Sequence, residues 1–96
     1  MTISIAHKDN THGGYFKATD ENGVKLGEMT YGWAGDDKII IDHTGVESPY
    51  EGLGVGKQMV MKAVEFARSA NIKIVPLCPF ATAMFNRHPD INDVRY

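Results

Sequence analysis

The residues with the clearest chemical potential lie in the stretch SPYEGLGVGKQ, residues 48–58, where three glycines alternate with apolar residues and a lysine follows. Glycine has no side chain to keep a ligand away from the backbone N–H groups. Where such a loop opens a helix, the first N–H groups of the helix are unpaired and its dipole favours negative charge. Lys57 adds a positive charge nearby. The pattern therefore predicts an anion site, with phosphate as the expected group.

Two common phosphate motifs do not fit this loop. The P-loop requires a glycine five residues before the Gly-Lys pair and Ser or Thr after the lysine. Those positions hold Glu51 and Gln58. The dinucleotide fingerprint GxGxxG fails as well, because its third glycine would fall on Lys57 or Met59. A different phosphate-bearing ligand is therefore expected.

The first half of the chain is typical of β-strands. Alternating or β-branched residues predict strands at 3–7, 14–20, 24–33 and 38–46, with Gly27 expected to mark a bulge in the third. The sequences ENG and AGDD provide turns between them. These four strands are expected to form an antiparallel meander.

After the glycine loop the hydrophobic period changes to that of a helix. Apolar residues recur at steps of three and four from Val55 to Ala67, and Asn71 is a plausible stop. Residues 72–78 predict a further strand, and residues 80–87 predict two short helical turns. A strand, a helix and a strand form a right-handed βαβ crossover, so the two strands are parallel. The fold class is therefore α+β: a mixed sheet with one main helix and a short C-terminal helix.

Length and composition limit the function classes. The 96 residues predict a single domain, 1–96, and the net charge of −2 argues against a nucleic-acid groove or a polybasic membrane patch. The lone cysteine excludes an intramolecular disulfide, and the four histidines show no zinc-ligand spacing, so no metal site is expected. The N-terminus does not have the pattern of a signal peptide, and no apolar run approaches the length of a membrane span. The expected location is the cytoplasm.

The glycine loop resembles the Q/R-x-x-G-x-G/A motif of the GNAT superfamily of acyl-CoA-dependent N-acetyltransferases. Gly54 and Gly56 match the motif's glycines, and Gly52 fits the frequent RGxGxG version. The DHTGV before the loop and the CPF at 78–80 look like those of small single-domain bacterial GNAT-like proteins. The resemblance covers residues 38–96, and the first 37 residues match only as a plausible meander.

The resemblance implies a coenzyme A site. The amides from Gly52 to Lys57 would hold the pyrophosphate, and the pantetheine arm would lie along Gly45 and Val46, where the parallel strands separate. The cofactor-binding candidates are Gly45, Val46, Glu51, Gly52, Leu53, Gly54, Val55, Gly56 and Lys57. Glu51 departs from the motif, because its carboxylate stands at the Gln/Arg position and repels phosphate. Acetyl-CoA is the expected co-substrate.

The catalytic acid that the family often uses is missing. Its tyrosine would fall on the short last helix, where the nearest residue is Phe85, which has no proton to donate. Cys78 and His43 remain, each near the end of one of the parallel strands. Cys78 could protonate the departing thiolate or attack the thioester, or it could simply fill the core. His43 could take the proton of the amine or serve only as a hydrogen-bonding partner, and Asp42 should face away from it unless a bulge intervenes.

The function predicted from the sequence is an acetyl-CoA-dependent N-acetyltransferase acting on an amine of a small molecule or a protein. One alternative is an acyl-CoA-binding module that has the fold without the activity. Another is a small interaction protein whose glycine loop is unused. The sequence leaves the acceptor open. It also allows a monomer or a weak homodimer, since an exposed strand edge at 72–78 would permit pairing. No nucleic-acid or membrane partner is expected.

Overall fold

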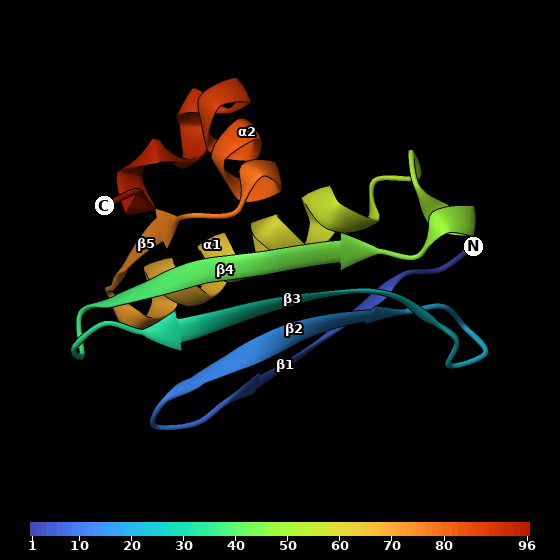
Figure 1. The fold of residues 1–96 in the computed structure, drawn as a ribbon, viewed down its shortest axis with the longest axis horizontal. Helices are drawn as coiled ribbons and strands as arrows, with labels where there is room; N and C mark the ends of the chain where they lie inside the picture. Colours follow the sequence, from blue (N-terminus) through green and yellow to red (C-terminus); the bar gives the residue numbers. More distant parts are fainter.

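Five strands form one sheet in the order β1-β2-β3-β4-β5, and the main helix packs against one face of it (Figure 1). The computed structural model describes residues 1–96. Its elements are β1 Ser4–Asp9, β2 Gly13–Thr19, β3 Lys25–Trp33, β4 Lys38–Val46, the 3-10 turn η1 Ser48–Tyr50, α1 Val55–Ala70, β5 Lys73–Pro76, α2 Pro79–Arg87 and the 3-10 turn η2 Pro89–Val94. The α+β class with a short C-terminal helix is confirmed.

The sheet is mixed, as the order of the predicted elements required. Strands β1 to β4 pair antiparallel with their neighbours in sequence. Strand β5 then pairs parallel to β4, from Lys38 opposite Lys73 to Ile41 opposite Pro76. Helix α1 provides the crossover, because parallel strands cannot be joined by a tight turn. Beyond Ile41, β4 continues for five residues, 42–46, without β5 beside it.

Helix α1 begins and ends at residues with left-handed backbone. Gly54 precedes it at φ +82°, and Asn71 follows it at φ +57°, with its N–H donating to carbonyls of the last turn. The apolar stripe of the helix is buried against the sheet, at Val55, Met59, Val60, Ala63, Val64 and Ala67. Opposite it lie buried side chains of the sheet, among them Phe16, Leu26, Met29, Ile39 and Ile41. Burying each large apolar side chain contributes roughly 1.5–3 kcal/mol, so this interface holds the fold together.

Two irregularities interrupt β3 and β4. In β3, Ala18 faces Gly27 while Thr19 faces Lys25, so the extra residue is Leu26. The bulge expected at Gly27 therefore lies one residue earlier. Gly27 itself allows a close helix contact, since a Cβ there would lie 3.2 Å from Met59 Cε.

The second irregularity is a bulge at Asp42 in β4. Thr30 faces His43 whereas Tyr31 faces Ile41, so Asp42 has no partner of its own on β3. The Asp42 carboxylate accepts a hydrogen bond of 2.6 Å from Thr30 Oγ1. A bulge adds one residue to the two-residue period of a strand and so exchanges the faces of all residues after it. Thr44 and Val46 are thereby turned to the helix side of the sheet.

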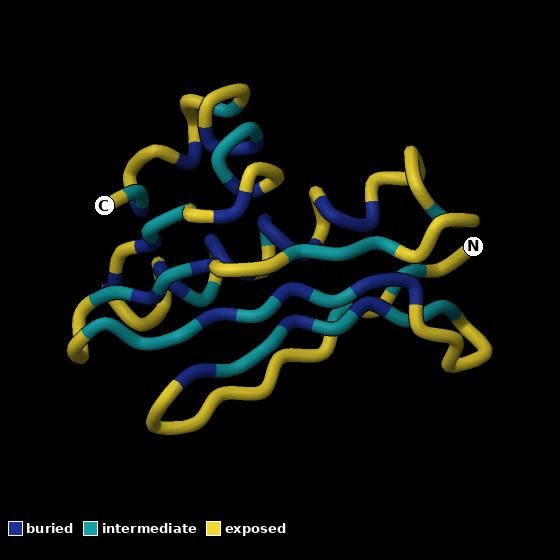
Figure 2. Tube along the Cα trace, in the orientation of Figure 1, coloured by how far each residue is buried: buried dark blue, intermediate teal, exposed yellow.

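The C-terminal segment covers part of the β5 edge. Arg95 forms a parallel bridge with Ile74, and the Tyr96 N–H donates to the Ile74 carbonyl at 2.8 Å. The expectation of a free edge along 72–78 is therefore wrong at the centre of that segment. Strand β1 at the other border of the sheet is exposed over most of its length (Figure 2).

No helix combines the length and the apolar character that crossing a bilayer demands. No group of three or more His, Cys, Asp or Glu side chains is arranged so that it could hold a metal ion.

Candidate functional site

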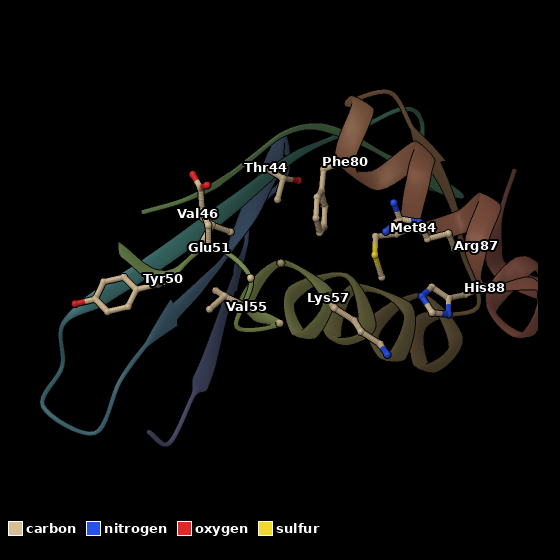
Figure 3. Close-up of a pocket in the computed structure, with 13 residues that line it drawn as sticks. Thr44, Val46, Tyr50, Glu51, Val55, Lys57, Phe80, Met84, Arg87 and His88 are labelled. Atoms are coloured by element: carbon tan, nitrogen blue, oxygen red, sulfur yellow. The ribbon is translucent and has the colours of Figure 1, made fainter. Parts of the chain in front are cut away.

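A cavity of about 460 Å³ opens between the end of β4, the glycine loop and α2 (Figure 3). The separation of β4 from β5 after Ile41 creates it, because α2 fills only part of the space that β5 vacates. The lining residues are Thr44, Val46, Tyr50, Glu51, Gly52, Gly54, Val55, Gly56, Lys57, Phe80, Met84, Arg87 and His88. Five of the predicted cofactor-binding glycine-loop residues are among them, together with Val46 and Lys57. Gly45 and Leu53 are not, and Leu53 is half exposed.

The glycine loop holds a run of free backbone donors beside this cavity. Gly52 and Gly54 adopt φ of +81° and +82°, a backbone conformation that costs other residues roughly 1–2 kcal/mol. The N–H groups of residues 52–57 meet no acceptor in the loop or on a side chain, and the first helical bond runs from Gln58 to Gly54. Successive unpaired amides at a helix start form an anion-binding site together with the helix dipole.

Gly56 has a different role from the other two glycines. A Cβ on Gly56 would lie 2.5 Å from Phe80 Cζ, so a side chain there would require the Phe80 ring to move. Phe80 therefore packs directly on the first turn of α1. Its ring forms one wall of the cavity (Figure 3).

Three groups that carry or can carry positive charge line the cavity: Lys57 on α1, and Arg87 and His88 at the end of α2. Glu51 is the only carboxylate in the lining, and its side chain lies at the opposite end of the cavity from these three (Figure 3). The sequence reasoning found Lys57 and missed Arg87 and His88. The adjacent basic pair at the end of the last helix was the available signal. The direction in which these two side chains point depends on how α2 docks, and the local sequence does not encode that docking.

Cys78 lies behind the cavity wall. It is buried, and its Sγ accepts a hydrogen bond from the Ala81 N–H at 3.4 Å, which caps the start of α2. Thr44 Oγ1 lies 3.3 Å from the same sulfur and also lines the cavity. The thiol is therefore one side chain removed from the cavity.

His43 lies on the other face of β4. Adjacent residues of a strand point to opposite sides, and Thr44 faces the cavity and Cys78. His43 instead lines a second, smaller cavity of about 160 Å³ with Lys25, Glu28, Gly45, Val46 and Glu47. The bulge at Asp42 is the reason, since an unbroken alternation would have placed His43 on the side of Ile39 and Ile41. Cys78 and His43, the two catalytic candidates, therefore both lie near the ends of the parallel strands but on opposite faces of the sheet.

Phe85, the residue nearest to the expected position of a catalytic tyrosine, belongs to the core. Phe85 is fully buried and takes no part in lining the cavity. Thr44 and Tyr50 are the hydroxyl-bearing residues of the lining, and the Tyr50 hydroxyl points away from the cavity (Figure 3).

The sequence matches a family model. The model, described as GCN5-related N-acetyl-transferase, covers residues 14–94. A Staphylococcus aureus protein described as GCN5-like, whose solution structure is known, is 37% identical, with a TM-score of 0.72 over 95% of this chain and 87% of the other. Among proteins with curated function, none matches.

More distant solved structures share the fold. An IAA acetyltransferase from Bacillus cereus has a TM-score of 0.72 at 14% identity, over 90% of this chain and 75% of the other. A Bacillus anthracis protein of the streptothricin acetyltransferase type, in complex with acetyl coenzyme A, has a TM-score of 0.63 at 18% identity, over 86% of this chain and 49% of the other. The present chain thus spans about half of that neighbour. With the family model matching residues 14–94, the chain belongs to the GCN5-related N-acetyltransferase family.

Proposed function

We propose that this protein binds acetyl-CoA in the cavity between β4, the glycine loop and α2, and that it transfers the acetyl group to an amine. The observation that carries the proposal is the run of free N–H groups at residues 52–57, which opens α1 beside Lys57 and Arg87. A pyrophosphate requires such a set of donors and cations, and the helix dipole adds to it. The Bacillus anthracis neighbour, which is known with acetyl coenzyme A, supports the same ligand here.

The residues present fit the different parts of the ligand. The loop amides and Lys57 would hold the pyrophosphate, while Arg87 and His88 would offer charge to a further phosphate. The end of β4 at Gly45 and Val46 has no neighbour on its β5 side, so its backbone groups would be free there for the pantetheine arm, although only Val46 lines the cavity. Glu51 opposes binding only weakly, because it is exposed and lies away from the cations (Figure 3).

The reaction needs an acid for the departing thiolate and a base for the amine. When bound, acetyl-CoA supplies the activated acetyl group as a thioester. Cys78 is the proposed group at the thioester, through either of two roles. As an acid it would give its proton to the departing sulfur, relayed by Thr44, which stands between it and the cavity. As a nucleophile it would take the acetyl group and pass it to the amine.

A second candidate function is that of an acyl-CoA-binding module without activity. It is favoured by the buried Phe85, which stands where a tyrosine would act, and by the burial of Cys78. The two functions share the cofactor site and differ only in turnover.

Turnover separates them. Purified protein would be incubated with acetyl-CoA and a panel of primary amines, and acetylated amine and free coenzyme A would be measured by mass spectrometry. Transfer above the rate without protein supports the enzyme. Tight coenzyme A binding without transfer to any amine supports the binding module, and a lack of coenzyme A binding leaves only an interaction protein.

A further inference from the structure

The face of β4 that is turned away from the proposed coenzyme A site has a cavity of its own. Its lining comprises Lys25, Glu28, His43, Gly45, Val46 and Glu47, and its volume is about 160 Å³. That volume suits a small head group. Neither the glycine loop nor α2 contributes a residue to it.

The two cavities meet at one residue of β4. Val46 lines both of them, and Gly45 lies beside it without a side chain. The ladder between β4 and β5 ends at Ile41 and Pro76, so this part of β4 has no neighbour on its β5 side. A group in the second cavity is therefore separated from the first only by the free end of one strand.

His43 is held over this strand end. Its Nε2 would lie 3.3 Å from a Cβ on Gly45, so the ring covers the glycine, as residues two apart on one face do. The imidazole forms no hydrogen bond with the protein, which leaves both nitrogens for a ligand. An unbonded nitrogen of a neutral imidazole can accept a proton.

The two carboxylates that line the cavity with His43 differ in whether they are paired. Glu28 is paired with Lys25 at 3.1 Å. Glu47 makes no ion pair, and its carboxylate meets no donor within the chain. The cavity thus holds a free carboxylate and a free imidazole within one small space, an arrangement suited to a ligand with one reacting nitrogen and one that stays charged.

We infer that this second cavity is the acceptor site, and that it takes a small diamine or a similar amine with a second positive charge. The inference rests on the proposed function. Glu47 pairs with the distal ammonium. His43 accepts one proton from the reacting ammonium, and the freed nitrogen attacks the acetyl carbon. The carbon–sulfur bond then breaks, the departing sulfur takes the proton of Cys78 through Thr44, and the second proton of the nitrogen restores the thiol.

Binding of the amine is tested first, by NMR with 1,4-diaminobutane in the absence and presence of coenzyme A. Amide shifts are expected at Glu28, His43, Gly45 and Glu47. Glu47→Gln should weaken binding about two- to fivefold, the range of an exposed ion pair. Glu65→Gln, on the outer surface of α1, should leave it unchanged, and butylamine should bind less tightly than the diamine. Shifts at the Asp9, Trp33 and Asp36 end of the sheet, no shifts, or equal binding of both amines would overturn the inference.

The role of His43 has a kinetic test. With 1,4-diaminobutane as acceptor, His43→Gln should lower kcat at least about 100-fold, the scale of a lost general base, with an unchanged KM for acetyl-CoA. An unchanged kcat would overturn the role. A separate result would refute the proposed function itself: coenzyme A would cause no amide shifts at residues 52–57, whether or not the diamine binds.

Discussion

Gly56 and Phe80 fit together only because the glycine has no side chain. A Cβ on Gly56 would lie 2.5 Å from Cζ and 2.8 Å from Cε2 of the Phe80 ring. This contact joins the first turn of α1 to the first turn of α2 and forms one wall of the proposed coenzyme A site. The last glycine of the motif therefore shapes the cavity through a side chain 24 residues later in the sequence.

Gly56→Ala should lower the free energy of unfolding by about 1–3 kcal/mol, the usual cost of overpacking. The Phe80 ring must move to admit the new methyl group, because its atoms are the ones that the methyl would meet. Adding Phe80→Leu should recover part of the loss, since the smaller side chain leaves room for the new methyl group. Urea unfolding of the single and double variants measures both effects. An equal loss with and without Phe80→Leu would show that the clash does not involve the ring.

Lys57→Gln and Arg87→Gln should each weaken coenzyme A binding about two- to fivefold at low salt. The reason is the loss of one cation beside the phosphates, at a site that is exposed to solvent. Lys62→Gln, which removes an exposed charge of the same helix away from the cavity, is the matched control. Calorimetric titrations at two salt concentrations measure the effect, which should shrink as salt rises. If all three variants bind alike, the phosphates lie elsewhere.

Cys78 allows a three-way test. Incubation with acetyl-CoA alone should add one acetyl group at Cys78 if the thiol is a nucleophile, and mass spectrometry of the peptide would locate it. If the thiol is the acid, Cys78→Ser should lower turnover and leave coenzyme A affinity unchanged, because only the transition state is affected.

The contribution of Cys78 to the stability of the fold is measured separately, in variants of this residue. Cys78→Ala removes the cap of α2 and the contact with Thr44, and should cost on the order of 1 kcal/mol of stability. Cys78→Ser should cost less, because serine is a good N-cap. Full activity of Cys78→Ala together with an absence of acetyl adduct would restrict the residue to this capping role.

His7 should make stability depend on pH. The Tyr31 hydroxyl donates to Asp9 at 2.5 Å, so Nε2 of His7 must donate to the Tyr31 oxygen at 2.7 Å. Partial burial lowers the pKa of His7 below 6.5, although Asp9 opposes this shift. The unfolded chain therefore binds more protons at this site in the interval below pH 6.5, and stability rises with pH across that interval.

Urea unfolding at a series of pH values measures this dependence. The slope of the unfolding free energy should be smaller in His7→Gln than in the natural protein as pH rises towards 6.5. His12→Gln is the control, since the side chain of His12 forms no hydrogen bond with the protein. Equal slopes in all three proteins would remove His7 as the cause.

The sequence allowed the order and kind of the main elements to be predicted, because the signals are local. Strand β4 was predicted with the bounds that it has, Lys38–Val46, and the stop of α1 at Asn71 follows from its left-handed backbone. The glycine loop was found for the same reason, since its conformation is required by the residues themselves.

The parts that could not be predicted depend on contacts between distant residues. Nothing in the local sequence around Asp42 signals a bulge, since the bulge arises from pairing with β3, and so the face of His43 was not foreseen. The approach of Arg87 and His88 to Lys57 depends on how α2 docks on α1. The cover that Tyr96 gives to Ile74 depends on the path of η2, a segment with weak sequence signals.

The central claim is that the free amides at the start of α1 hold the phosphates of acetyl-CoA. Residue-resolved NMR during a titration with acetyl-CoA tests it most directly. We expect the largest amide shifts on residues 52–58, with further shifts at 45–46, and we expect Lys57→Gln to weaken them. Shifts confined to another surface, or none at millimolar ligand, would contradict it.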